Sequence, residues 1–214
     1  MSTSSNSGSL LVVSAPSGAG KTSLLRALLD SEDDLVLSVS HTTRPARSGE
    51  RDGVDYHFID ANEFESMVSA GEFLEHATVF GNRYGTGRAQ VNASLERGID
   101  VILEIDWQGA RQIRRAMRES VHLFVLPPSW RALEQRLRDR GTDAGEVIEA
   151  RMRAAGGEIA HFAEFDYLVV NDDFDRALEG MRAVVQAARL RLARQQVRHA
   201  DLIRDLLAEG GPIE

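Results

Sequence analysis

The sequence contains no cysteine and no long apolar run. The lack of cysteine excludes a disulfide scaffold and a cysteine-based zinc site, and it fits a reducing compartment. No apolar run approaches the roughly 18 residues expected of a membrane helix. The start, MSTSSNSGS, lacks the basic residues and the apolar segment of a signal peptide, so we expect residues 1–9 to form a short disordered tail. These absences predict a soluble, cytoplasmic protein with no membrane partner.

Positive charge is also in short supply. The chain has 25 lysine and arginine residues against 33 aspartate and glutamate residues, a formal net charge of −8 at pH 7. This balance argues against a general affinity for nucleic acid or for an anionic membrane, so a bound anion must meet local basic clusters. Lys21 is the only lysine in the chain. A lone lysine among arginines indicates a position that needs a compact ammonium rather than a planar guanidinium.

The apolar residues that are present alternate between strand-like and helix-like patterns. The chain has 214 residues, of which 43% are hydrophobic, enough for one sizeable core. We predict strands at 10–14, 35–39, 101–106, 122–126 and 166–170. We predict helices at 22–29, 89–97, 108–118 and 131–138. Alternation of this kind is typical of an α/β fold in which flanking helices cover both faces of a parallel sheet.

Two segments interrupt this alternation. Residues 41–84 are turn-rich and polar around a short helix, which indicates a small mixed α+β insertion. Residues 129–157 read as an arginine-rich helix pair broken by RGTDAG. The end of the chain, from Asp175 to Ala208, has one long helical pattern.

The stretch SAPSGAGKTS lies between the first predicted strand and the first predicted helix. It matches the phosphate-binding loop G-x-x-x-x-G-K-[ST], except that Ala15 replaces the first glycine. In such a loop, backbone N–H groups wrap the phosphates, the lysine reaches the outer phosphates and the hydroxyl coordinates magnesium. The alternative is a glycine-rich turn before a helix. The residues expected to bind ATP are Ala15, Pro16, Ser17, Gly18, Ala19, Gly20, Lys21, Thr22 and Ser23.

Five blocks together carry a family resemblance. SAPSGAGKTS, SHTTRPARSGERDGVDYHF, GEFLEHATVFGNRYGT, LEIDWQG and VNDDFD occur in the order and spacing of the bacterial guanylate kinases, a P-loop nucleoside monophosphate kinase family. The resemblance spans residues 10 to about 198. It implies transfer of the γ-phosphate of ATP to GMP or dGMP with Mg²⁺. It also implies a P-loop kinase core (10–40, 91–128 and 158–208), a GMP-binding insertion (41–90) and a helical lid (129–157).

The block TTRPAR places two guanidinium groups, Arg44 and Arg47, on one loop. The fork of an arginine bonds two phosphate oxygens at once, and two polyanions can approach each other only where positive charge is supplied. In the family the matching arginines hold the GMP phosphate, together with residues that match Ser40, Tyr56 and Tyr84. The alternative is a solvated basic turn.

Guanine offers N1–H and an exocyclic amine as donors and O6 as an acceptor. A carboxylate that accepts both donors would select guanine over adenine. Glu75 matches the family residue with that role, and Thr86 matches the hydroxyl that donates to O6. Glu104 matches a position near the base that usually holds aspartate. The alternative for Glu75 is a solvent-facing strand residue.

Glu104 and Asp106 lie two residues apart at the end of a predicted strand, so we expect them to share a face beside the phosphate loop. We expect Asp106 to join the magnesium shell through water, with Thr22 as the direct ligand. The alternative for Asp106, which does not exclude that role, is a cap on the helix that opens at Trp107.

Arg136 and Arg140 lie four apart on one helical face, with Arg151 across the following turn. The resemblance implies that these arginines close over ATP and neutralise the migrating phosphoryl group. The alternative is ordinary surface charge. Asn171 matches a residue near the adenine. The expected catalytic residues are Lys21, Arg44, Arg136, Arg140 and Arg151.

Other readings stay open at this point. A guanylate-kinase-like module that binds protein peptides keeps the fold without activity, but such modules typically have eroded phosphate loops. Another phosphate-loop kinase with a different acceptor is opposed by Glu75 and Thr86. The C-terminal helix carries Leu202, Ile203 and its neighbours beyond the expected core, either packed on its own domain or available for homo-oligomer formation.

Overall fold

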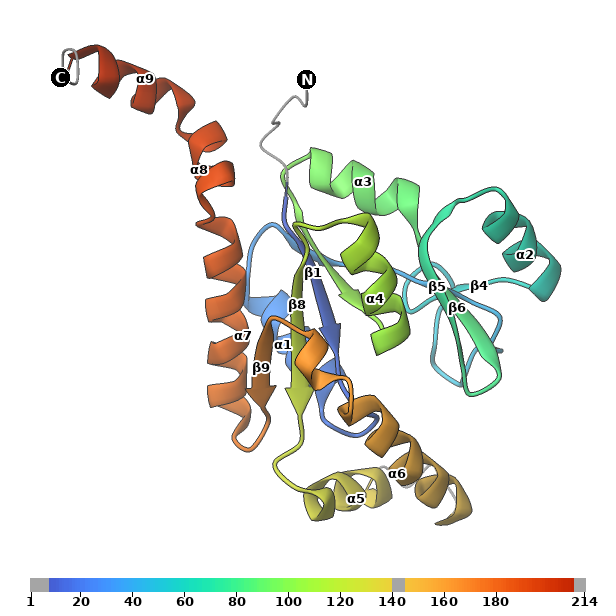
Figure 1. Ribbon diagram of the computed structural model, residues 1–214. Helices are drawn as coiled ribbons and strands as arrows, with labels where there is room; N and C mark the ends of the chain where they lie inside the picture. The colour runs from blue at the N-terminus through green and yellow to red at the C-terminus, as the bar shows by residue number, and fades with distance from the viewer. Residues whose placement is uncertain (1–7, 140–144, 210–214) are drawn as a thin grey trace.

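A parallel sheet forms the centre of the molecule. The computed structural model describes residues 8–139 and 145–209 (Figure 1). In the described residues the sheet has five strands, and every neighbouring pair is parallel. Their order is β2 (Leu35–Leu37), β7 (Asp100–Glu104), β1 (Leu10–Ser14), β8 (Val121–Leu126) and β9 (Tyr167–Val170). The predicted α/β fold with a parallel sheet is confirmed.

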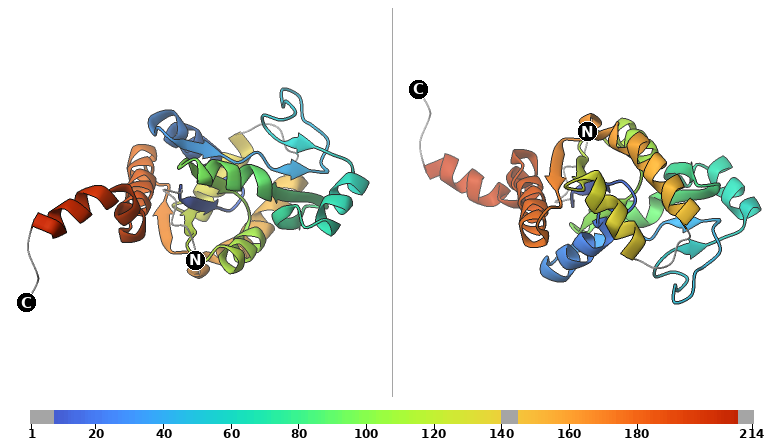
Figure 2. Two further views of the ribbon diagram at one scale, coloured as in Figure 1. Left: turned by 90° about the horizontal axis from the view of Figure 1, so that it is seen from above. Right: turned by 90° about the horizontal axis from the view of Figure 1, so that it is seen from below.

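Helices cover both faces of this sheet (Figure 2). Alternate residues of β1 point to opposite sides, as in any strand. Leu11 and Val13 pack with α1 (Lys21–Ser31) and α7 (Phe174–Arg189), whereas Leu10 and Val12 pack with α3 (Arg88–Glu96) and α4 (Trp107–Ala116). The uninterrupted apolar run of β1 follows from this double coverage, because both of its faces are buried.

The insertion forms a second, mixed sheet. Its order is β4 (His57–Phe58), β3 (His41–Thr42), β6 (Asn82–Gly87) and β5 (Phe73–Val79). β3 pairs with β4 in parallel, and the other pairs are antiparallel. Helix α2 (Ala61–Ser69) is capped by Asp60, whose side chain accepts from the N–H groups of Asn62 and Glu63. The predicted mixed insertion is therefore confirmed.

The predicted helix pair after the core strand β8 is also present, as α5 (Trp130–Asp139) and α6 (Gly145–Ile159). Each helix has one buried face made of apolar residues, which include Leu133 on α5 and Ile148 on α6. A 3-10 turn, η1 (Phe162–Glu164), connects α6 to β9. Residues 140–144 lie outside the described residues, and Arg140 is one of them.

The prediction of one long helix over 175–208 is wrong. The structure has three helices there: α7, α8 (Leu192–Arg198) and α9 (Ala200–Glu209). Leu190 and Arg191 separate the first two, and Arg191 has an extended ψ of 135°. Arg189 Nε lies 2.7 Å from one oxygen of Asp100, and Arg194 Nη1 lies 2.5 Å from the other. In an unbroken helix these arginines would point about 140° apart, so the break lets both reach the fully buried Asp100.

The prediction of a disordered tail at 1–9 is wrong for its last two residues. The N–H of Gly8 donates to the carbonyl of Leu95 at 2.7 Å, and the N–H of Ser9 donates to Asp100 at 2.7 Å. Both residues are thus fixed to the core, while residues 1–7 lie outside the described part of the chain.

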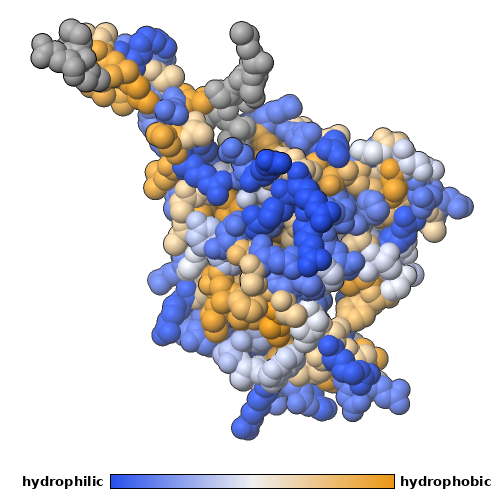
Figure 3. Space-filling model, viewed as in Figure 1, coloured by the Kyte–Doolittle hydropathy of each residue, from blue (hydrophilic) through white to orange (hydrophobic). Residues whose placement is uncertain are grey.

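Helix α8 is held to the body of the molecule by Arg194, whereas α9 extends away from it (Figure 1). No residue of α9 is buried, and Leu202, Leu206 and Leu207 are more than half exposed. Figure 3 shows this apolar surface as an orange run at the upper left. Across the described ranges, no helix combines the length and the apolar character needed to cross a membrane.

Candidate active site

The phosphate loop joins the carboxyl end of β1 to the first residue of α1. Gly18 and Gly20 have φ values of 92° and 91°, a region that glycine enters without strain. A Cβ on Gly18 would lie 3.0 Å from Leu133 and Leu137, and one on Gly20 would collide with the Asn171 amide. Ala15 packs against the apolar core, so its methyl group is accommodated where the motif has glycine. Sequence and conformation agree on a phosphate loop.

A cavity of about 280 Å³ opens beside this loop. It brings together most of the residues predicted for nucleotide binding. Besides the loop residues 15–22, its lining includes Ser40, Tyr56, Glu75, Tyr84, Glu104, Asp106 and Glu158. A second cavity of about 450 Å³ contains Arg44 and Arg47. The two cavities share Thr22, Tyr56, Tyr84 and Glu104, so they are parts of one continuous site.

Glu104 is the acid next to the loop lysine and threonine. Thr22 Oγ1 donates to Glu104 Oε1 at 3.0 Å, and Lys21 Nζ lies 3.6 Å from the same oxygen. Register explains the contact, because Glu104 pairs with Val13, the second-last residue of β1, close to the start of the loop.

Asp106 caps α4, as the alternative interpretation held, and its role in the magnesium shell stays a prediction. Its carboxylate accepts from the N–H of Gly109 at 3.0 Å and from the Gln108 side chain at 2.8 Å. Strand β7 ends at Glu104, so the alternation of side chains along a strand does not set the direction of Asp106. Its charge acts on Glu75, whose pKa it helps to raise.

Glu75 and Thr86 form a buried pair between β5 and β6. The Thr86 hydroxyl donates to Glu75 Oε1 at 2.6 Å, and their side chains are 0% and 3% exposed respectively. Burial raises the pKa of Glu75 to about 7, against the lowering effect of the Thr86 hydrogen bond. A Cβ on Gly109 would collide with Glu75 Oε2, so this glycine makes room for the carboxylate. The solvent-facing alternative for Glu75 is wrong.

Arg44 is held in place rather than solvated. It donates to Glu50 Oε1 at 2.8 Å and to the carbonyl of Pro45 at 2.8 Å, and its guanidinium lies 5.4 Å from the centre of the Tyr56 ring. The hydrogen bond from Arg44 is the main cause of a lowered Glu50 pKa. Glu50 also accepts from the N–H of Arg47, whose side chain is exposed. Sequence reasoning missed Glu50, although it lies within the same polar block.

Arg136 and Asn171 meet at the phosphate loop. Arg136 Nη1 and Asn171 Nδ2 both donate to the carbonyl of Ala19, at 3.1 and 2.8 Å, and Arg136 Nη2 donates to the carbonyl of Asn171 at 2.9 Å. These bonds brace the loop backbone. The surface-charge alternative fits Glu134 and Arg138, which pair at 2.6 Å. Arg140 lies outside the described residues.

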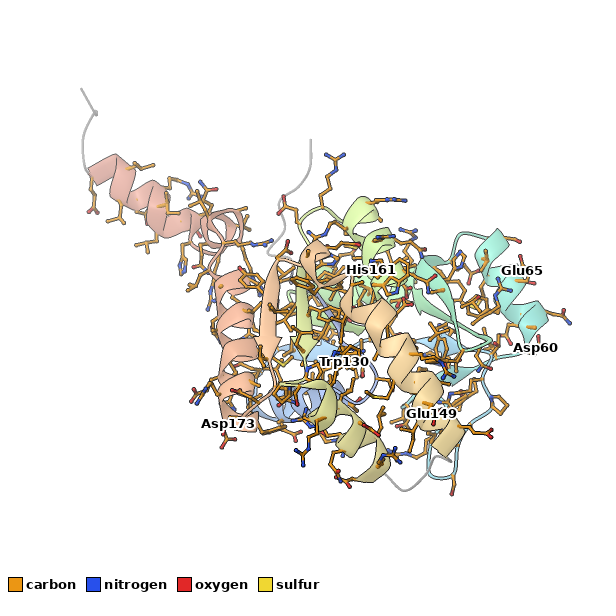
Figure 4. All side chains as sticks on the ribbon, turned by 60° about the horizontal axis from the view of Figure 1, so that its bottom comes forward. Asp60, Glu65, Trp130, Glu149, His161 and Asp173 are labelled. Atoms are coloured by element: carbon orange, nitrogen blue, oxygen red, sulfur yellow. The ribbon has the colours of Figure 1, made fainter. Side chains whose placement is uncertain are left out.

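One further site residue, Glu158, was not predicted. It belongs to the last turn of α6, and its Oε2 accepts from the N–H of Ser17 at 3.1 Å. In Figure 4, α6 crosses the molecule between the labelled residues Glu149 and His161. No local pattern around GGEIAHF indicates this contact, because it depends on how α6 approaches the loop.

The fold and the site together define a class. A phosphate loop at the carboxyl end of a central parallel strand, with basic groups and a buried carboxylate in the same cavity, is typical of a P-loop nucleotide kinase.

Comparison with known proteins narrows the class. The model of the family "Guanylate kinase" matches residues 7–188. Guanylate kinase from Alkalilimnicola ehrlichii is 58% identical over 94% of this chain and 98% of the relative, and that from Hahella chejuensis is 55% identical over 94% and 97%. The crystal structure of guanylate kinase from Anaplasma phagocytophilum matches with a TM-score of 0.77 at 37% identity, covering 98% of both chains. The chain belongs to the guanylate kinase family, whose members are ATP:GMP phosphotransferases.

Proposed function

We propose that this chain transfers the γ-phosphate of ATP to GMP and dGMP, giving ADP and the nucleoside diphosphate. The observation that carries the proposal is the single site that joins the phosphate loop to the buried Glu75–Thr86 pair. Family membership and the curated names of its relatives support an enzyme over the non-catalytic binding module.

On the donor side, the loop N–H groups bind the phosphates of ATP, and Lys21 stabilises the charge that moves with the phosphoryl group. Arg136 and Asn171 hold the carbonyl of Ala19, which keeps this peptide group from turning toward the anion. Arg136 therefore acts on ATP through the loop. Arg140 and Arg151 are proposed to neutralise the charge of the migrating phosphoryl group when the lid closes over ATP.

On the acceptor side, Arg44 and Arg47 bind the GMP phosphate, with Ser40, Tyr56 and Tyr84 around it. The attacking atom is already an anionic phosphate oxygen, so the reaction needs no general base. Charge neutralisation and in-line positioning do the catalytic work.

The base is read by the buried carboxylate. Glu75 accepts the N1–H and amine of guanine, and Thr86 turns its hydroxyl from Glu75 to donate to O6. The interaction of Asp106 with Glu75 supports a place for Asp106 at the base edge, in the role we first gave to Glu104.

The residues beside the loop fit a magnesium ion. Thr22 and Glu104 offer hydroxyl and carboxylate oxygens 3.0 Å apart, the hard ligands that Mg²⁺ prefers. The described residues contain no cluster of three or more acids and histidines for a metal, which suits an ion shared with the ATP phosphates. Bound with ATP, Mg²⁺ would neutralise phosphate charge. We therefore assign its protein contacts to Thr22 and Glu104 rather than to Asp106.

We also propose the domain roles that the resemblance implies: a core (10–40, 91–128 and 158–208), a GMP-binding insertion (41–90) and a lid (129–157). The lack of cysteine supports a cytoplasmic location.

The direct test measures ADP formation from ATP with GMP, dGMP, AMP and UMP as acceptors. We expect rapid turnover with the guanine nucleotides alone. A folded protein that binds GMP without any turnover would instead support the binding module, and a preference for AMP or UMP would support a kinase with another acceptor.

A further inference from the structure

Glu158 brings a carboxylate to the backbone that we assign to ATP phosphates. It lies half-buried at the end of α6 and lines the same cavity as the phosphate loop, Glu104 and Asp106. Its Oε2 accepts from the N–H of Ser17 at 3.1 Å. Ser17 is the third residue of the loop, so the contact spans 141 positions of the chain and is set by tertiary structure.

The electrostatic surroundings of Glu158 are mixed. Burial raises the pKa of this carboxyl, and the charge of Asp106 adds to the effect. The Ser17 hydrogen bond and the charge of Lys21 lower it. The carboxylate thus interacts with the loop backbone and with the loop lysine, the two groups that bind phosphate in this motif.

A carboxylate and a phosphate are chemically similar ligands for such a loop, because both offer anionic oxygens to N–H donors. The N–H of Ser17 has one hydrogen to donate. A phosphate oxygen that takes this hydrogen must displace Glu158, and a phosphate that only approaches it meets a like charge in a partly buried site.

We propose that Glu158 competes with the triphosphate of ATP for the phosphate loop and thereby sets the affinity for ATP. The proposal rests on the loop being the ATP site. It also couples ATP binding to α6, because the displaced carboxylate belongs to that helix.

The surroundings of Glu158 suit a helix end that moves. Gly156 and Gly157 precede it, and glycine weakens a helix relative to alanine. Beyond it, His161 stacks on Trp107 with ring centres 3.7 Å apart and lies 2.7 Å from Glu164. The aromatic anchor on α4 therefore lies after Glu158, and the weak turn lies before it.

The test is the binding of ATP, and separately of tripolyphosphate, to purified full-length Glu158→Gln by calorimetry without GMP. Glutamine keeps an acceptor for Ser17 but removes the negative charge. We expect both ligands to bind roughly tenfold more tightly, from removal of one repulsive charge in a partly buried site. In assays, the KM for ATP should fall while the KM for GMP stays constant.

Glu149→Gln is the matched control. Glu149 lies on the same helix, its side chain is 73% exposed and its interaction with Arg153 spans 4.0 Å, so ATP binding should not change. Unchanged or weaker binding of both ligands by folded Glu158→Gln would overturn the proposal. Because GMP is absent, a failure of the proposed GMP kinase activity would not alter this result.

A measurement on the unmodified protein covers the case in which the variant does not fold. Nuclear magnetic resonance can follow the Ser17 amide and the Glu158 carboxyl carbon during titration with tripolyphosphate. Displacement predicts that both signals shift with the same dissociation constant. A Glu158 signal that stays in place at saturation would show that the carboxylate is not displaced, and the proposal would then be wrong.

Discussion

The Thr86 hydroxyl donates to the Glu75 carboxylate at 2.6 Å, between two strands of the inserted sheet and away from solvent. Glu75 and Thr86 therefore hydrogen-bond to each other when no base is bound. Guanine can replace this hydrogen bond, because its N1–H and amine can donate to Glu75 and its O6 can accept from Thr86, whereas adenine cannot. The pair makes base selectivity the most direct property to test.

Selectivity should depend on Glu75. AMP presents an unprotonated N1 to the carboxylate and no O6 to Thr86, so its kcat/KM should be about 10⁴-fold to 10⁵-fold below that of GMP. The variant Glu75→Gln turns one acceptor into a donor that faces the donors of guanine. We expect kcat/KM for GMP to collapse while the weak AMP rate barely changes.

The measurement is kcat/KM for GMP, dGMP, AMP and UMP in both proteins. Glu63→Gln, an exposed change on α2, is the control and should keep the full preference. A Glu75→Gln protein that retains its preference for GMP would show that the base is read elsewhere.

The binding of guanine should depend on pH near neutrality. The pKa of Glu75 is raised to about 7, so the free site takes up a proton as the pH falls through this value. The donors of guanine need the charged carboxylate, hence affinity should decline toward pH 6 and level off above pH 8. Guanosine is the suitable probe, since it lacks the titrating phosphate of GMP. Affinity that stays constant from pH 6 to 8 would contradict the raised pKa.

Lys21 should act on the transition state. Lys21→Met removes the positive charge beside the migrating phosphoryl group, and we expect kcat to fall by about 10²-fold to 10³-fold. Lys21→Arg keeps the charge but replaces a compact ammonium with a planar fork, so it should restore only part of the activity. The comparison uses steady-state rates with circular dichroism as the check on folding. Near-normal kcat in Lys21→Met would remove the residue from the mechanism.

Glu104 and Asp106 should have separable effects. Glu104→Gln alters the contact with Lys21 and Thr22, so it should raise the magnesium concentration needed for half-maximal rate, with little change in the KM for GMP. Asp106→Asn removes a charge that acts on Glu75, so it should mainly raise the KM for GMP. Titrations of magnesium and of GMP in both variants give the comparison. The reverse pattern would restore the assignment that we made from the sequence.

The apolar surface of α9 should support self-association. Leu202, Leu206 and Leu207 are exposed on a helix without a buried residue, in the segment that we first considered a homo-oligomer contact. Truncation after Arg198 should lower the mass measured by light scattering to that of a monomer. Leu207→Ser provides a milder test. Equal monomeric masses before and after truncation would rule out this surface as an interface.

Local pattern was enough for much of the molecule. The apolar runs predicted the strands of the parallel sheet. Gly18 and Gly20 indicated the phosphate loop because its backbone conformation favours glycine, and Lys21 indicated it because it is the only lysine in the chain. The mixed α+β character of the insertion followed from its turn-rich sequence around a short helix, but its four-stranded sheet was not predicted.

The remaining features depend on contacts between distant residues. Nothing in the periodicity of residues 175–208 predicts a break, because the break lets Arg189 and Arg194 reach Asp100 on the distant strand β7. The orientation of Asp106 depends on where β7 ends, and the sequence pattern of a strand does not predict its last residue accurately. Glu158 reaches the loop from a helix of the lid pair, so its role was visible only once α6 was in place.

The ion cluster at Asp100 has a consequence for the order in which the protein can be completed on the ribosome. The carboxylate is 0% exposed, yet both of its arginine partners come about 90 residues later. A nascent chain that has already made β7 would have to bury an unpaired negative charge to finish its sheet, which is costly. The strand that carries Glu104 at its far end therefore gains its full support only when Arg189 and Arg194 have emerged. Assembly of the catalytic end of the sheet thus depends on one of the last segments to be synthesised.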